Sequence, residues 1–446
     1  MISQILFALV LLAGAGLFAR RVKTIRRNIL LGRDVNRTDS KSERLNTMIR
    51  VALGQSKMVV RPIAGILHIF VYIGFILINI EVLEIVLDGL LGTHRLFAEP
   101  LGGFYDFLIG SFEILAFLVL FACVVFLIRR NVIHIRRFRS PELTGWPKSD
   151  ANLILITEVL LMFALLSMNA TDALLQEANA QNVAEAAHYH EAGSFPISTF
   201  LRPLYSGLSV SSLIVVERFM WWFHIVGIMA FLVYVSYSKH LHIFLAFPAT
   251  YYSNLKPKGS MTNMAAVTRE VQLMLDPQAD PYAAAPPVDG TPQRFGAKDI
   301  TDLTWKQIMD GYSCTECGRC TSVCPANQTG KLLSPRKILM DTRDRAEEYG
   351  KHLDAGTVEQ DTKTLLGSYI TEEELWACTT CNACTDACPV NLDPLSVILE
   401  MRRYLIMEES KSPESITSMF NNVENNGAPW AFPAADRAKW MDELNA

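Results

Sequence analysis

The amino-acid sequence predicts an all-α protein: a five-span transmembrane helical bundle followed by a C-terminal α-helical ferredoxin-like domain. Two observations predict this fold. Long apolar runs, near or above the roughly 20 residues that cross a bilayer, crowd the first half of the 446-residue chain. Eight of the nine cysteines then form two copies of the pattern C-x-x-C-x-x-C-x-x-x-C-P. The net charge of −4 gives no reason to expect nucleic acid as a partner.

The apolar runs predict the spans and the position of the N-terminus. They are, approximately, Ile2–Ala19, Ile63–Leu91, Phe104–Ile128, Leu153–Leu175 and Leu213–Phe247. The first run lacks a basic segment before it, and its positive charges follow at Arg20, Arg21 and Lys23. This arrangement indicates an uncleaved anchor with its N-terminus outside, rather than a signal peptide.

The basic residues of the loops orient the other spans. Twelve Lys or Arg residues lie between Arg20 and Arg61, and six lie between Arg129 and Lys148. The intervening loops, 92–103 and 176–212, carry one each. Because basic loops stay in the cytoplasm, we expect a multi-pass protein of the cytoplasmic (inner) membrane with its C-terminal domain in the cytoplasm.

The predicted domains follow from changes in composition. We expect a membrane domain at 1–250, a linker at 251–298, a dicluster domain at 299–410 and a tail at 411–446 that contacts a partner protein. The linker is rich in Pro, Gly and Ala, including AAAPPVDG, with one short amphipathic helix near Met264–Leu275.

Helix signals lie within and after the insert between the two cysteine motifs. Ser334 and Pro335 suit the N-cap and first turn of a helix through SPRKILMDTRDRAEEYG. TEEELWAC opens with a capping box, and DPLSVILEMRRYLIMEE makes a third helix after Asp393. These signals predict a helical domain with no sheet of note.

The cysteine spacing predicts two [4Fe–4S] clusters. Thiolate sulfur is a soft ligand, and three cysteines spaced by two residues surround one corner of an iron–sulfur cube. The fourth cysteine, which precedes proline, typically binds the other cluster. The predicted ligands are Cys314, Cys317, Cys320 and Cys388 for the first cluster, and Cys378, Cys381, Cys384 and Cys324 for the second.

Zinc and disulfides are the alternatives. Zinc sites usually show two separated C-x-x-C pairs, which these runs do not resemble. Disulfides need an oxidising compartment, whereas the expected topology places these cysteines in the cytoplasm. The ninth cysteine, Cys123, lies in an apolar run and is expected to be a small buried hydrophobe.

Histidines in the spans suggest a haem. His224 and His242 are 18 residues apart, so on one continuous fifth helix they share a face, with His240 pointing elsewhere. His68 on the second span lies at a depth similar to that of His242, and these two suit the axial ligands of an inner haem. Because no C-x-x-C-H occurs, the haem would be b-type and non-covalent. Packing or interfacial roles are the alternative.

Other polar residues at membrane depth are less defined. His224 suits a second, outer haem with His94, a quinone site or a structural role. Buried carboxylates next to a haem carry the protons of quinone reduction, and Glu113 and Glu158 are the best placed. The full set of such carboxylates is Glu81, Glu84, Asp88, Glu113 and Glu158.

The membrane half resembles the gamma-type, di-haem cytochrome b of respiratory nitrate reductases. The resemblance lies in the span pattern and in ILHIFVYIGF and FHIVGIMAFLVYVSYSKHLHIF. It implies that His68 and His242 bind the inner haem and that His224 is an outer haem ligand. The outer ligand of the second span is expected near position 78, where this chain has Ile78.

The C-terminal half resembles the small dicluster (C-type) component of heterodisulfide reductase and the iron–sulfur component of anaerobic glycerol-3-phosphate dehydrogenase, through its eight cysteines and inserted helices. The fusion of both halves is similar to membrane iron–sulfur oxidoreductases that work between electron-transfer flavoprotein and menaquinone. In those proteins a cysteine-rich (CCG-type) domain, of the B-like kind found in heterodisulfide reductase, follows. The tail segment Gly427–Phe432 resembles a stretch near that domain.

These features predict a membrane electron-transfer component of a quinone-linked oxidoreductase. Its expected partners are a cysteine-rich (CCG-type) heterodisulfide reductase B-like subunit, electron-transfer flavoprotein and a membrane quinone, preferably menaquinone. Substrate chemistry is expected on the partner, because no nucleotide-binding fingerprint appears here. The alternatives are a membrane anchor or redox sensor without quinone turnover, and an anchor for a molybdenum enzyme. The fused dicluster domain argues against the last.

Overall fold

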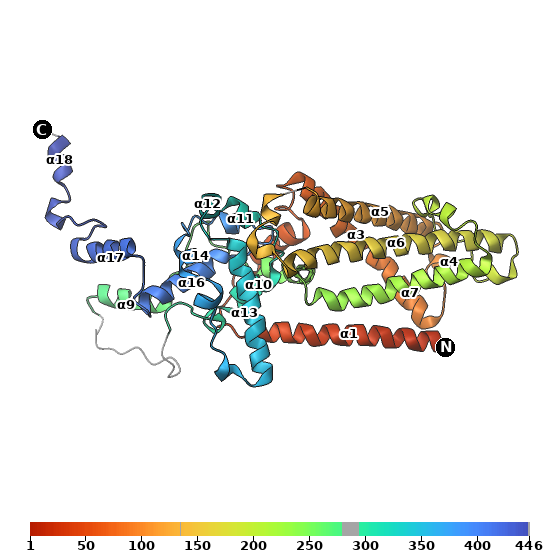
Figure 1. Cartoon of the computed structure of the whole chain (residues 1–446), viewed down its shortest axis with the longest axis horizontal. Coiled ribbons are helices and arrows are strands. Elements are labelled where there is room, and N and C mark those ends of the chain that lie inside the picture. Colours follow the sequence, from red (N-terminus) through yellow and green to blue (C-terminus); the bar gives the residue numbers. More distant parts are fainter. Residues whose placement is uncertain (134, 279–293, 445–446) are drawn as a thin grey trace.

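The computed structural model describes residues 1–133, 135–278 and 294–444, and it is helical throughout, with no β-strand in these residues (Figure 1). An elongated helical bundle lies at one end and a compact helical domain at the other. The five long helices are α1 (Ile2–Ile29), α3 (Pro62–Leu91), α5 (Gly103–Asn131), α6 (Trp146–Ala180) and α7 (Val210–Val235). All five are long and apolar enough to cross a membrane, which confirms the predicted five-span bundle.

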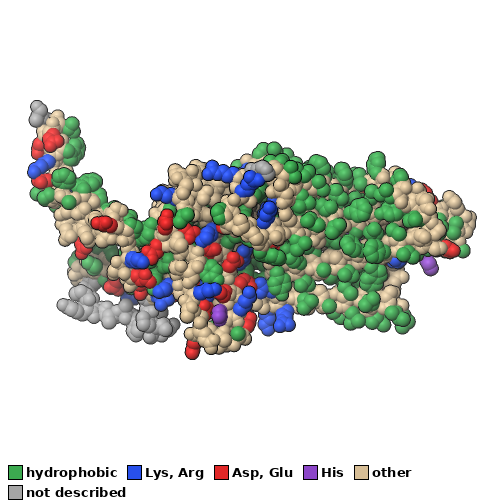
Figure 2. Space-filling model, viewed as in Figure 1, with side chains coloured by type: hydrophobic (Ala, Val, Ile, Leu, Met, Phe, Trp, Pro, Cys, Tyr) green, Lys and Arg blue, Asp and Glu red, His purple; other side chains and the backbone are tan. Residues whose placement is uncertain are grey.

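The spans form a closed ring. α1 packs against α3 and α7, α5 packs against α3 and α6, and α6 packs against α7. On the face shown in Figure 2, apolar side chains cover the ring, whereas charged side chains gather on the other domain and at the far tip. This distribution is what a lipid-facing surface requires.

Shorter helices complete the chain. α2 (Lys41–Met48), α4 (Ala98–Leu101), α8 (His242–Tyr251) and α9 (Ala265–Leu275) lie outside the spans. The short helix predicted in the linker is α9, while the AAAPPVDG segment of that prediction lies outside the described residues. The cluster domain holds α10 (Trp305–Ser313), α11 (Arg319–Val323), α12 (Pro325–Gln328), α13 (Pro335–Ala355), α14 (Glu372–Trp376), α15 (Ala383–Ala387) and α16 (Pro394–Met407), and the tail holds α17 (Glu414–Asn426) and α18 (Lys439–Leu444).

The three helices predicted around the insert are present as α13, α14 and α16. The capping box of α14 joins Thr371 and Glu374 as expected, and Asp393 caps α16 by accepting from the Ser396 amide. Ser334 precedes α13, but its hydroxyl donates to Glu142 of the loop between α5 and α6 instead of capping the helix.

The fifth span is shorter than predicted, and the predicted end at Phe247 is wrong. α7 ends at Val235, and a turn separates it from α8. The carboxylate of Asp150, on α6, accepts hydrogen bonds from the Ser238 hydroxyl (2.7 Å) and the Lys239 amide (3.2 Å), and also from the Tyr234 hydroxyl. Because the Asp150 carboxylate accepts hydrogen bonds from the polar groups of the turn, the chain can leave the helix here without burying unpaired donors. His224 and His242 therefore lie on different helices, and the inference that they share one helix face is wrong.

The cluster domain is held against one end of the bundle. That end carries the N-terminus of α3 and the C-termini of α1 and α7 (Figure 1). Arg336 of α13 donates to the Arg137 carbonyl (2.8 Å) and pairs with Glu142 (2.6 Å). At the end of α1, the Asn28 amide donates to Tyr312 (3.0 Å). The loop between α5 and α6 and the end of α1 thus contact the cluster domain.

Candidate metal centres

The two cysteine motifs fold alike. Cys314 ends α10, Cys320 lies in α11, and Cys324 precedes the proline that begins α12. The backbone is left-handed at Glu316 and Gly318, two and four residues after the first cysteine. Such positions are rare for residues other than glycine and reverse the chain tightly.

The second motif repeats this geometry. The left-handed residues are Thr380 and Asn382, again two and four places after the first cysteine, Cys378. α15 holds Cys384 and is followed by Cys388. Because α11 and α15 pack against each other, the two curled loops face one another, which is the local reason for a paired site.

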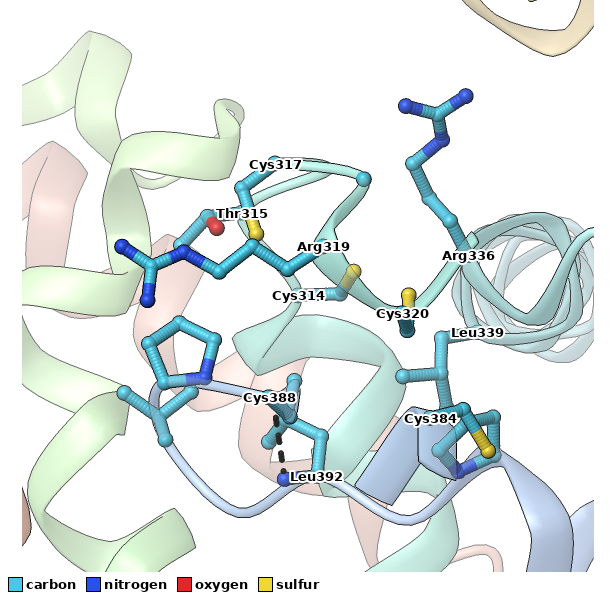
Figure 3. A pocket seen from close by; sticks show the side chains of 14 residues that line it. Cys314, Thr315, Cys317, Arg319, Cys320, Arg336, Leu339, Cys384, Cys388 and Leu392 are labelled. Atoms are coloured by element: carbon cyan, nitrogen blue, oxygen red, sulfur yellow. Dashed lines mark hydrogen bonds between the residues drawn. The ribbon is translucent and has the colours of Figure 1, made fainter. Parts of the chain in front are cut away.

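Cysteines of both motifs meet in one pocket (Figure 3). Cys314, Cys317, Cys320, Cys384 and Cys388 line it. The pocket thus holds all four predicted ligands of the first cluster, together with Cys384, which was predicted for the second. Crossed ligation stays a prediction.

The chemistry of the donors suits iron–sulfur clusters. All nine cysteines are free. Burial raises the pKa of the Cys314 and Cys384 thiols to about 12, so a metal must supply the positive charge that holds them as thiolates. The amides of Thr380 and Leu392 point at Cys378 Sγ (3.4 Å) and Cys388 Sγ (3.3 Å), and such bonds to sulfur tune cluster potentials.

The two sites differ in their surroundings. The first lies beside the membrane domain, since the side chain of Arg319 binds the carbonyls of Lys57 and Met58, just before α3. In the second motif, Cys381 is exposed to solvent. One site therefore faces the bundle and the other has an open edge.

Two of the predicted haem ligands meet at the end of the bundle that carries the cluster domain. The rings of His68 and His242 have centroids 6.4 Å apart. Two imidazoles on one metal, with bonds of about 2.0 Å each, have centroids roughly 6 Å apart. His242 Nδ1 contacts the Lys239 carbonyl (3.2 Å), which leaves Nε2 for a metal, and His68 Nδ1 is buried without a partner. The pair fits a bis-histidine haem.

His240, which was expected to face away, lies beside this pair. Its ring is 5.4 Å from that of His242 and packs on Phe231. The break after α7 is the reason, because the short turn Lys239–Leu241 brings both histidines inward.

The predicted pairing of His224 with His94 is not what the structure shows. His224 Nδ1 contacts the Leu161 carbonyl of α6 (3.0 Å), whereas His94 Nε2 contacts Asp172 of α6 (3.4 Å). Eleven residues of helix separate these contacts by about 16 Å, too far for two ligands of one iron. His224 Nε2 is buried without a partner. Ile78 packs in an apolar core with Phe7 and Ile225, so no second-span ligand replaces His94.

The two predicted proton carriers have different environments. The Glu113 carboxylate accepts hydrogen bonds from the amides of Ile197 (2.9 Å) and Ser198 (3.1 Å), from the Ser198 hydroxyl and from Asn169 (3.1 Å). It anchors the loop between α6 and α7 to the bundle. Glu158 lies near Cys123 and makes no ion pair with the described residues.

Sequence reasoning missed the buried arginine at the end of the bundle away from the cluster domain. Arg95, 9% exposed, binds Asp172 (2.6 Å), Asn169 (3.0 Å) and Tyr105 (3.1 Å). Its loop position suggested only a surface charge. Asp172 and Asn169, polar residues at the end of an apolar run, were the available signal.

Fold and site together define a multi-pass membrane protein with a dicluster iron–sulfur domain. The sequence family described as 4Fe-4S dicluster domain matches residues 313–392. No solved structure matches.

Three curated relatives agree with that class. The chain is 30% identical to the probable iron–sulfur-binding oxidoreductase FadF of Bacillus subtilis, over 99% of this chain and 61% of the relative. It is 26% identical to EtfAB:quinone oxidoreductase of Syntrophomonas wolfei, over 92% of this chain and 55% of the relative. The C-type component of a CoB-CoM heterodisulfide reductase from Methanosarcina acetivorans is 30% identical over 26% of this chain and 60% of its own length.

The chain thus spans little more than half the length of its full-length relatives. These comparisons point to a membrane-anchored iron–sulfur oxidoreductase that transfers electrons, and they support [4Fe–4S] binding. The resemblance of the membrane half to a cytochrome b is a prediction that they do not test.

Proposed function

We propose that this chain conducts electrons between a soluble redox partner and a membrane quinone. The conductors are two [4Fe–4S] clusters with crossed ligation and one b-type haem held by His68 and His242. The observation that carries the proposal is the 6.4 Å separation of these two rings, at the end of the bundle where the first cysteine site docks. A haem there is the next electron acceptor after that cluster.

The surroundings of the clusters support an order of transfer. The exposed Cys381 suits the second cluster to receive electrons from a partner. The first cluster, under the loop that precedes α3, suits transfer toward the membrane. Because transfer falls steeply with distance, a chain of centres that begins at the surface and ends in the bundle is what such a task requires.

The partner we propose is a cysteine-rich (CCG-type) protein like that of heterodisulfide reductase, or electron-transfer flavoprotein. Oxidation of the flavoprotein and reduction of a quinone, preferably menaquinone, is the proposed direction; the name of the S. wolfei relative, EtfAB:quinone oxidoreductase, supports the flavoprotein and quinone as reactants. The tail offers a contact surface, since Trp430 and Phe432 are exposed. The cluster domain would lie in the cytoplasm and the N-terminus outside.

The chain's own residues then have distinct roles. A haem bound here supplies one-electron transfer, and His68 and His242 hold it from helices α3 and α8. Quinone reduction also consumes protons, and Glu158 is the proposed carrier because no ion-pair partner among the described residues occupies its carboxylate. Glu113 is not retained as a carrier, since backbone and side-chain donors saturate it.

An optical spectrum tests the haem. Reduction of the purified protein with dithionite should give the paired α and β bands of a low-spin b-type haem. A membrane anchor or redox sensor without quinone turnover would hold clusters without these bands.

A matched pair of variants tests the ligands. His242→Ala should remove the haem bands while iron and sulfide contents still correspond to two clusters. His240→Ala, which removes a neighbouring ring at 5.4 Å, should keep the bands. Loss of the bands in His240→Ala but not in His242→Ala would show that His240, and not His242, is the haem ligand.

A further inference from the structure

Arg319 is a buried cation without a buried anion beside it. Its side chain lies between the second and third cysteines of the first motif in sequence and is 6% exposed. Its donors bind the Lys57 carbonyl (2.8 Å), the Met58 carbonyl (3.1 Å) and the Met58 sulfur (3.0 Å). Among the described residues, no carboxylate forms an ion pair with it.

A buried charge is costly unless an opposite charge compensates it. The other buried arginine at this pocket, Arg336, has such a partner in Glu142 (2.6 Å). Arg319 instead lines one pocket with Cys314, Cys317, Cys320 and Cys388. These four are the proposed ligands of the first cluster, whose negative charge would compensate the guanidinium.

The position of Arg319 connects two redox sites. Its stem lines the pocket and its guanidinium points out of it, on the side opposite Arg336 (Figure 3). Its guanidinium binds the carbonyls of Lys57 and Met58 in the loop that leads into α3, the helix that carries His68. A single guanidinium thus joins the first cysteine site to the segment that leads to the proposed haem ligand.

The geometry points to Arg319 as the counter-ion of the first cluster and a determinant of its reduction potential. Reduction adds one negative charge to a cluster that its thiolates already make anionic, so a nearby cation favours the reduced form. Arg319 is a positioning residue rather than a ligand. It also fixes the loop before α3, on which His68 depends, and this haem-related part rests on the proposed function.

The second motif has a matching residue. The half-buried Arg402 of α16 donates to the carbonyls of Leu375 (3.0 Å) and Cys378 (2.5 Å), and its charge acts on the Cys378 thiolate. No carboxylate of the described residues pairs with it. Arg402 therefore provides a control in which the same change is made beside the other cluster.

The test is a redox titration of the full-length protein followed by electron paramagnetic resonance. Arg319→Gln should lower the potential of the first-site cluster and leave the second unchanged, and Arg402→Gln should do the reverse. At a fixed solution potential, each Arg→Gln variant should lower the reduced-to-oxidised ratio of its neighbouring cluster about tenfold. This is the effect of removing a unit charge roughly 10 Å away at an effective dielectric constant of about 20. The cluster signals are assigned with Cys388→Ser.

Arg319→Lys keeps the charge but changes the hydrogen bonds, so it separates the two effects. It is also the variant to measure if Arg319→Gln does not retain its iron. Because Arg319→Lys keeps the charge, its ratio of reduced to oxidised first-site cluster at the same solution potential should stay within about twofold of the wild-type ratio. Equal shifts of both clusters, no shift, or a fall in Arg319→Lys would overturn the proposal. The haem band should also titrate at a lower potential in Arg319→Gln. If no haem is present, the proposed function fails but the cluster measurement still decides this inference.

Discussion

The ion pair between Lys239 and Glu316 joins the membrane domain to the cluster domain, and its removal should weaken that junction. Both side chains are buried, at 8% and 3% exposed. Lys239 Nζ also donates to the Pro147 carbonyl (2.7 Å). Burial opposes ionisation of Glu316, but Lys239 and Arg343 outweigh it and lower its pKa. Lys239→Met leaves this carboxylate with Arg343 alone, at 2.9 Å.

Removing one partner of a buried pair costs about 3–5 kcal/mol. Because Arg343 remains, we expect about 3 kcal/mol, and at roughly 2–4 °C per kcal/mol the melting temperature should fall by about 6–12 °C. The assay is thermal unfolding of the detergent-solubilised protein, followed by intrinsic fluorescence and by the visible absorbance of the clusters.

Two further variants make the measurement specific. Lys256→Met, at an exposed lysine outside the interface, should melt like the wild type. The double variant Lys239→Met, Glu316→Gln removes the carboxylate that has lost one of its two cations and leaves Arg343 paired with Asp344 (2.9 Å), so it should recover at least half of the loss. If Lys239→Met melts like Lys256→Met, the buried pair does not hold the domains together.

Three other changes test separate parts of the structure. Cys388→Ser should damage the cluster held by the first motif rather than its own; retention of both paramagnetic signals at full intensity would contradict crossed ligation. Burial raises the pKa of Asp341 to about 7, above its unfolded value of about 3.9, so the contribution of this group to stability is greatest below about pH 4 and is lost as the pH rises to about 7. Asp341→Asn should therefore raise the melting temperature at about pH 8 and raise it roughly a third as much at about pH 5; an equal gain at both would refute the burial argument. Gly296 has φ of +75°, and a Cβ there would lie 2.2 Å from the Glu400 carbonyl oxygen, so Gly296→Ala should destabilise by about 2–3 kcal/mol, whereas Gly356→Ala, which meets no atom within 4 Å, isolates the smaller cost of φ alone.

The parts that sequence predicts well are those in which local pattern and tertiary structure agree. Apolar runs located the first four spans because a segment that crosses lipid must be a long helix with an apolar surface. The cysteine spacing is tied to left-handed residues at fixed offsets, so it carries the local fold of both loops. Helices α13, α14 and α16 begin at the predicted residues, because local sequence signals for a helix start agree there with the tertiary fold.

The parts that sequence misses depend on contacts between distant residues. The apolar stretch after Val235 looks like uninterrupted helix, and only Asp150, on another helix, ends it. His94 suited an outer haem by depth alone, but Asp172 lies nearer. Arg319 and Lys239 carry no sequence pattern, because their roles arise only when the two domains meet.

The break after α7 has a mechanical consequence. His242 begins α8, and α8 packs against α10, the helix that ends at Cys314. A displacement of the cluster domain relative to the five-span ring would therefore move this imidazole and change its distance from His68, which lies on α3. The spacing of the two rings thus depends on how the cluster domain is seated on the bundle.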